Sequence, residues 1–182
     1  MITTTLKALR EHKACISGYN KLACHVTGNQ YDAGRETYVR HKHGEPISLA
    51  TVLQSNDLDD ALWALRSCKQ TPEMIRAERL FGVWCARQVQ HLMTDERSIA
   101  ALDVAERHAN GCATDAELDA ARAASRAAAW AAAWDAAWDA ARAAASDAAW
   151  DAASNAARDA QKQMFTAVFC GDSINLNAML TK

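Results

Sequence analysis

The sequence predicts an all-α protein, a multi-helix bundle whose C-terminal half consists of long alanine-rich helices. Three observations support this prediction. Capping residues stand in front of several stretches with helical periodicity. No proline or glycine interrupts residues 115–169. No upstream segment shows the pattern of a β-sheet. With 182 residues, the chain is long enough for one domain with a hydrophobic core.

The first fifty residues predict two short helices and a loop. Thr5 stands in front of a first helix, which we expect to end at Gly18. A second helix is expected over residues 19–26, closed by Gly28. Residues 28–46 are polar, contain two further glycines and show no sustained period, so they predict a long loop.

Two helices are expected between residues 48 and 69. Ser48 is a suitable N-cap for a short helix through Leu53. Ser55 or Asn56 is expected to cap the next helix, from Asp57 to about residue 69. Three aspartates lie in its first turn, where the helix dipole stabilises anions, so we interpret them as helix chemistry and not as a metal site.

Two longer helices follow. Thr71 and the proline after it predict the start of a helix over residues 71–93, whose apolar positions cover much of its surface, as in a central helix. Asp95 is expected to cap a helix over residues 95–110, which Gly111 terminates. The apolar positions of the first helix are Ile75, Leu80, Val83, Trp84, Val89 and Leu92, and the expected buried face of the second is Ile99, Leu102 and Ala105 or Ala109.

A capping box opens the last helical segment. Thr114 can accept from the amide three residues on, and Glu117 can reach back to the Thr114 amide. A continuous helix over residues 115–169 would be roughly 80 Å long, whereas a compact domain of this size has a radius of gyration of about 16 Å. We therefore expect a helical hairpin, broken around Ala143–Asp147 or Ser154–Asn155.

A four-residue repeat runs through the alanine-rich tract. A four-residue step advances about 400° around a helix, so the row drifts about 40° per repeat and cannot form one flat groove on a straight helix. The repeated residues are Arg122, Arg126, Trp130, Trp134, Trp138, Arg142, Ser146, Trp150, Ser154 and Arg158, and a row of aspartates follows one residue behind, at Asp135, Asp139, Asp147, Asp151 and Asp159.

Three interpretations of this repeat stay open. The tryptophans can be core residues between alanine-surfaced helices, with the aspartates on a solvated face. Part of the surface can be a binding face, because tryptophan and arginine dominate binding energy at protein interfaces. The tract can also be a low-complexity expansion without a specific role. The candidate partner-binding residues are Arg126, Trp130, Trp134, Asp135, Trp138, Asp139 and Arg142.

The charge distribution separates an N-terminal head from the rest. Residues 1–47 form a helical and loop head and residues 48–182 a helical bundle, which we expect to make one compact unit. Residues 1–50 contain seven lysines and arginines against four acidic residues, whereas residues 115–160 contain four arginines against eight acidic residues. The net charge of −2 is neither that of a typical nucleic-acid binder nor that of a DNA mimic, so we expect no nucleic-acid partner.

The N-terminus and the cysteines predict a cytoplasmic protein. The chain lacks a charged start followed by an apolar stretch, and no run of about 18 uncharged apolar residues occurs, so we expect neither a secretion signal nor a membrane span. The six cysteines are far apart without a Cys-x-x-Cys pair. We expect free thiols.

No common catalytic or nucleotide-binding motif occurs, so we expect no enzyme, no catalytic residues, no cofactor and no metal. Two weaker interpretations concern the basic stretch at residues 40–43. With Cys15, Cys24 and His25 it could form a zinc site, although the spacing matches no common ligand pattern. Its histidines, His41 and His43, could alternatively contact phosphate.

Residues 95–106 (DERSIAALDVAE), residues 112–118 (CATDAEL) and the alanine, arginine and tryptophan tract to Gln161 support a family resemblance. Over about residues 95–165 the chain resembles alanine-rich immunity-type proteins of bacteria and related uncharacterised phage and prophage proteins. The resemblance implies a small protein that neutralises another protein by binding it. The target would be a toxin or, for a phage, a host defence component.

The leading functional hypothesis is therefore a small protein-binding inhibitor, of the immunity or phage counter-defence type, that occludes a partner protein through the helical half. Two alternatives remain. The chain can be a self-associating structural or assembly protein, with a second copy as its partner and no inhibitory role. It can also be an enzyme or a metal-binding protein.

Overall fold

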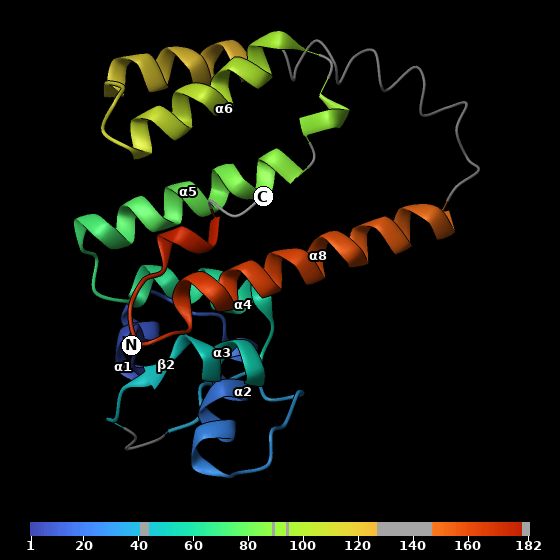
Figure 1. Cartoon of the computed structure of the whole chain (residues 1–182). Coiled ribbons are helices and arrows are strands. Elements are labelled where there is room, and N and C mark those ends of the chain that lie inside the picture. Colours follow the sequence, from blue (N-terminus) through green and yellow to red (C-terminus); the bar gives the residue numbers. More distant parts are fainter. Residues whose placement is uncertain (41–43, 89, 94, 127–146, 180–182) are drawn as a thin grey trace. The chain divides into compact units, whose positions relative to one another are not determined.

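The structure is a computed structural model that describes residues 1–40, 44–88, 90–93, 95–126 and 147–179, without the side chains of residues 92 and 147–154. Its secondary structure is almost entirely helical, which confirms the all-α prediction (Figure 1). Within these residues the exception is a small antiparallel pair, β1 (Thr3–Thr4) with β2 (Ile47–Ser48). No helix in the described part of the chain is long and apolar enough to cross a membrane.

The chain divides into two compact units. Unit 1 comprises Met1–Met74 and Met164–Lys182, and unit 2 comprises Ile75–Gln163. The predicted boundary between residues 47 and 48 lies inside unit 1. β1 and β2 are paired across that boundary, with Thr3 opposite Ser48 and Thr4 opposite Ile47, so the head and the following helices share one structure.

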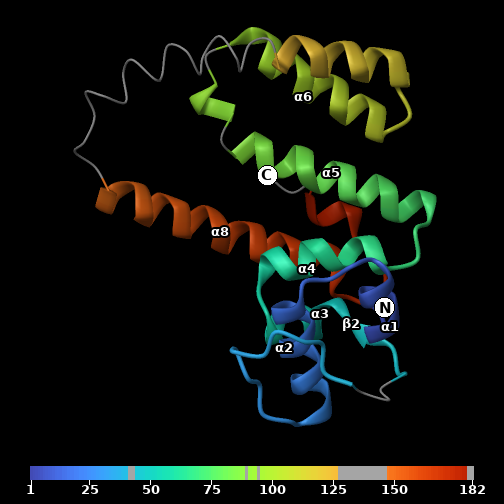
Figure 2. The same cartoon turned by 180° about the vertical axis from the view of Figure 1, so that it is seen from behind.

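Unit 1 is a small helical core closed by the C-terminal segment. In chain order its helices pack in consecutive pairs, α1 on α2, α2 on α3 and α3 on α4 (Figure 2). Near its end α8 buries one face in this unit, where Phe165, Val168 and Phe169 are all 0% exposed. The bounds are α1 (Leu6–Glu11), α2 (Ile16–Thr27), α3 (Leu49–Ser55), α4 (Leu58–Ala64), a 3-10 turn (Leu65–Ser67) and a second 3-10 turn (Leu176–Met179). α8 (Asp147–Phe169) belongs to unit 2 up to Gln163 and to unit 1 from Met164.

The starts of these helices follow local capping chemistry. Thr5 accepts a hydrogen bond from the amide of Ala8, and Ser48 accepts one from Thr51, as predicted. The cap of α4 is Asp57, whose carboxylate accepts from the amide of Asp60 at 3.0 Å, so the prediction of residue 55 or 56 was wrong. Asp57 is therefore the N-cap and not the first helical residue.

Gly18 corrects the prediction for the first two helices. The sequence placed a helix end there, but α1 ends at Glu11 and α2 starts at Ile16, so Gly18 lies inside α2. The break between the two helices contains Lys13, whose φ of 64° is in the left-handed region. A Cβ at Gly18 would lie 2.6 Å from Oδ2 of Asp60, so the absence of a side chain permits a close helix contact.

The predicted loop after α2 is confirmed for residues 28–40 and 44–46. Gly28 closes α2 in the left-handed conformation, with a φ of 69°. Asn20 of α2 is 1% exposed and holds the loop at two points: its amide donates to the Thr37 carbonyl at 2.9 Å, and its oxygen accepts from the Val39 amide at 2.9 Å. The loop is therefore tied to the core through one buried side chain.

Unit 2 begins on α5 (Pro72–Gln88), which Thr71 caps as predicted through the amide of Met74. Phe81 and Val83 are buried, whereas Ile75 is 38% exposed, so the apolar positions of this helix are not all covered. A 3-10 turn (Gln90–Leu92) follows α5, where the sequence predicted one helix to residue 93. The unit continues with α6 (Glu96–Ala109), capped by Asp95 as predicted, and with a helix over residues 115–126.

The sequence predicted a break in the C-terminal helix at one of two positions, and the structure has no break at the second of them. α8 runs without interruption through Ser154–Asn155. Serine or asparagine inside a helix costs only a fraction of a kcal/mol relative to alanine, less than losing the hydrogen bonds of a helical turn. The other position, Ala143–Asp147, falls largely within residues 127–146, which lie outside the described residues.

Candidate functional site

The predicted partner-binding tract directly follows a helical hairpin of unit 2, formed by α6 and the helix over residues 115–126 (Figure 1). Gly111 makes the turn with a φ of 74°. The Glu117 amide donates to Oγ1 of Thr114 at 3.2 Å, and Oε2 of Glu117 accepts from the Thr114 amide at 2.8 Å. The capping box is confirmed, and it orients the helix that leads into the tract.

Charged pairs reinforce the turn of this hairpin. Arg107 donates to Glu117 at 2.8 Å, and Nε2 of His108 lies 2.7 Å from Oδ1 of Asp115. The hydrogen bonds from Thr114, with a smaller contribution from Arg107, hold the pKa of Glu117 below its usual value. The hydrogen bond and charge of His108 likewise lower the pKa of Asp115. Both carboxylates are thus stabilised in their charged form.

A second set of polar contacts joins α5 to α6. The Arg87 guanidinium donates to Asp103 at 2.6 Å and to Glu106 at 2.9 Å, and these hydrogen bonds raise its pKa. Arg76 donates to Oδ1 of Asn110 at 2.8 Å. One face of α6 therefore carries ion pairs to α5.

The apolar surface of α6 is only partly covered. Ala109 is buried as predicted, but Ile99 and Leu102 are half-buried, so the prediction of a fully buried face was wrong for them. Val104 is half-buried as well. On the same helix Asp103 and Glu106 bond to Arg87 of α5, so polar contacts contribute to the packing of the two helices.

One of the seven predicted partner-binding residues lies in the described part of the chain. Arg126 is exposed at the end of the helix over residues 115–126. One turn earlier, Arg122 is also exposed and lies 3.6 Å from Asp119. The other six predicted residues, Trp130, Trp134, Asp135, Trp138, Asp139 and Arg142, lie outside the described residues.

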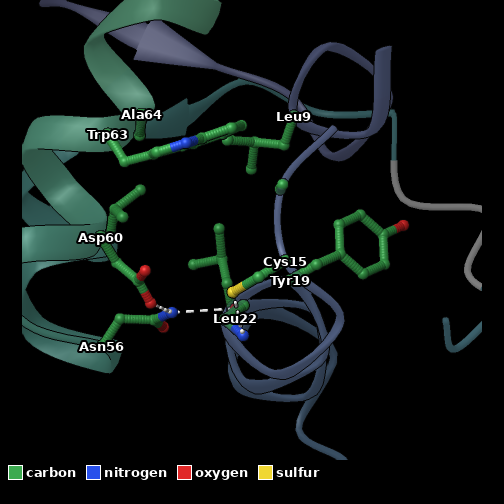
Figure 3. A pocket seen from close by; sticks show the side chains of 11 residues that line it. Leu9, Cys15, Tyr19, Leu22, Asn56, Asp60, Trp63 and Ala64 are labelled. Atoms are coloured by element: carbon green, nitrogen blue, oxygen red, sulfur yellow. Dashed lines mark hydrogen bonds between the residues drawn. The ribbon is translucent and has the colours of Figure 1, made fainter. Parts of the chain in front are cut away.

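Unit 1 contains a cavity of about 80 Å³ between α2, α3 and α4 (Figure 3). Its apolar side includes Trp63 and Leu9, which lie near one another in Figure 3. On its polar side the Asn56 amide donates to the Gly18 carbonyl at 2.9 Å and to Oδ2 of Asp60 at 2.6 Å. The volume fits a few water molecules at most, and the polar groups already bond one another, so the cavity is structural.

Unit 1 also has a larger, open cleft that the sequence analysis did not predict. It has a volume of about 720 Å³, and its lining includes three arginines, Arg10, Arg35 and Arg40. Arg10 comes from α1, and the other two come from the loop that Asn20 holds. The one feature of the sequence that pointed to this cleft was the excess of positive charge in residues 1–50.

The cysteines and histidines do not assemble into a metal site in the described residues, where no three His, Cys, Asp or Glu side chains are close enough to hold an ion. Cys15 and Cys112 are exposed, Cys24 and Cys68 are buried, and none of these four is in a disulfide. Burial raises the pKa of Cys85 and of Cys170, which keeps these thiols protonated and poorly nucleophilic. His41 and His43 lie outside the described residues.

Comparison with known proteins found no matching family model, no matching curated protein and no matching solved structure.

Proposed function

We propose that this protein acts by binding and occluding another protein, as a small inhibitor of the immunity or counter-defence type. The observation that carries the proposal is the partly uncovered hairpin of unit 2. Ile99, Leu102 and Val104 keep part of their surface accessible, and the exposed Arg126 lies in the same hairpin. Accessible aliphatic groups beside arginine and tryptophan are typical of interface cores.

The polar framework of the hairpin favours a binding role. The capping box and the Arg107–Glu117 pair restrict the turn before any partner arrives. A surface that is already ordered loses less conformational entropy on binding than a flexible one. In the sequence, the tract after Arg126 continues with the tryptophans and arginines of the four-residue repeat, the residue types that dominate binding energy at interfaces.

The test begins with affinity purification of the native protein from its own host and mass spectrometry of the proteins that co-elute. With the purified partner, the dissociation constant is measured for the wild type and for Arg126→Ala, Trp134→Ala and Trp138→Ala. We expect the affinity to fall about tenfold for a residue at the centre of the interface. Arg66→Ala, at an exposed arginine of unit 1, is the matched control and should leave the affinity unchanged.

Circular dichroism of each free variant separates binding from folding. If the tryptophan variants unfold, those residues are core, and the exposed Arg126→Ala variant decides the question. The proposal is refuted if no protein co-elutes or if the Arg126 and tryptophan variants bind like the wild type. Light scattering over a concentration series tests the self-assembling alternative, because a mass that rises with concentration would indicate copies of this chain as the partner.

A further inference from the structure

The open cleft of unit 1 combines positive charge with amide and hydroxyl donors. The arginines of its wall come from α1 and from the loop after α2, two segments that are apart in the sequence. A volume of about 720 Å³ is in the range of small-molecule sites. The lining residues are Arg10, Cys24, Asn29, Gln30, Arg35, Thr37, Tyr38, Val39 and Arg40.

The wall that carries Arg35 and Arg40 is fixed by the core. Asn20 is buried in α2 and bonds the loop backbone at Thr37 and at Val39, between the two arginines. Val39 is itself 8% exposed, so its side chain anchors the same stretch. The two arginines therefore project from a backbone that is held in place on both sides of Tyr38.

The third arginine is oriented by aromatic rings. The Arg10 guanidinium carbon lies 4.2 Å from the centroid of the Tyr38 ring and 5.7 Å from that of the Tyr19 ring. These two rings pack edge to face, with centroids 5.2 Å apart, and the Tyr38 hydroxyl donates to the Ala14 carbonyl. Stacking on a tyrosine holds the guanidinium plane while leaving its N–H groups free to donate.

Within the described part of the chain, Arg10, Arg35 and Arg40 form no ion pair with a carboxylate. No acidic side chain lines the cleft, although Asp32 and Glu36 belong to the same loop. The Asp32 carboxylate instead accepts from the Gly34 amide at 2.9 Å. The cleft is thus a concave positive surface in a chain whose net charge is −2.

We propose that this cleft binds the polyphosphate group of a small, nucleotide-sized anion. Guanidinium groups donate parallel hydrogen bonds that match phosphate oxygens, and three of them around one hollow can share the charge of a triphosphate. Asn29 and Gln30 add neutral donors to the lining. This site goes beyond the proposed function, which concerns unit 2.

A small anion fits the cleft better than a nucleic acid. Binding to a nucleic-acid backbone requires a basic stripe that neutralises several successive phosphates. The positive side chains of the cleft are instead grouped around one hollow, and the chain as a whole is slightly acidic. We therefore expect a ligand that carries several phosphates close together on one small molecule.

The test is isothermal titration calorimetry of the full chain with inorganic triphosphate and, separately, with adenosine triphosphate. We expect one saturable site, weakened about tenfold or more by each of Arg10→Ala, Arg35→Ala and Arg40→Ala, because each removes charge-assisted hydrogen bonds. Lys7→Ala is the matched control. Lys7 lies on α1 like Arg10 and carries the same charge, but it pairs with Glu11 at 3.8 Å and does not line the cleft.

Two comparisons decide the outcome. Equal affinities for the two ligands would show a site for phosphate alone, and tighter binding of the nucleotide would show that the base or ribose is also contacted; both support the proposal. It is overturned if neither ligand binds at millimolar concentration, or if Lys7→Ala weakens binding as much as Arg10→Ala does. Binding of an acidic peptide or an oligonucleotide in the absence of triphosphate binding would also overturn it.

Discussion

Replacing Asn20 by alanine tests the connection between the core of unit 1 and the loop that carries two of the cleft arginines. The side chain is 1% exposed, and it makes two 2.9 Å hydrogen bonds, one to the Thr37 carbonyl and one from the Val39 amide. Alanine removes both hydrogen bonds, because its side chain has neither a donor nor an acceptor. The Val39 amide is buried, so it would be left without an acceptor.

The expected cost follows from these two bonds. A buried amide left without a partner costs about 1–3 kcal/mol, and the loss of the bond to the less buried Thr37 carbonyl adds about 1 kcal/mol. We therefore expect the free energy of unfolding of unit 1 to fall by about 2–4 kcal/mol. Urea denaturation followed by circular dichroism measures this change, and hydrogen exchange of the Val39 amide reports it locally.

Asn29→Ala is the matched control for Asn20→Ala. Asn29 is exposed, and its side chain donates to Oγ1 of Thr27 at 2.8 Å. A substitution at such a surface position usually changes stability by less than about 0.5 kcal/mol. Equal urea midpoints for the two variants, together with an unchanged exchange rate at Val39, would show that Asn20 does not hold the loop. The backbone that carries Arg35 and Arg40 would then not be fixed by the core through this side chain.

Three further predictions test the packing and the electrostatics. Gly18→Ala should lower the melting temperature, because its Cβ would lie 2.6 Å from Oδ2 of Asp60, and the loss should be smaller in an Asp60→Ala background. Phe165→Ala should cost about 3–5 kcal/mol in urea denaturation, whereas the exposed neighbour Gln163→Ala should cost less than about 0.5 kcal/mol. The pKa of Glu117 is lowered in the folded protein. Its stabilisation of the hairpin is therefore present above the ordinary glutamate pKa of about 4.3 and is lost as the pH falls through the lower pKa of the folded state. Glu117→Gln should flatten the dependence of hairpin stability on pH, followed by NMR at a series of pH values.

The candidate sites differ in how far their features could be predicted from the sequence. The capping box at Thr114 was predicted and confirmed, because both of its hydrogen bonds join residues three positions apart. The cleft was not predicted, since Arg10 and Arg40 are separated by thirty positions and meet only when the loop folds back onto α2. The sequence carried one trace of it, the positive charge of the first fifty residues.

Helical character and helix starts could be predicted because they depend on interactions within one turn of the chain. Ser48, Thr71 and Asp95 cap their helices in the structure as the pattern indicated. Gly18 could not be interpreted in this way, because its role depends on Asp60, a residue of another helix. Local hydrogen bonds can thus be predicted from the sequence, because they join neighbouring residues. Burial, helix contacts and clustered charge cannot, because they arise from distant segments that pack together.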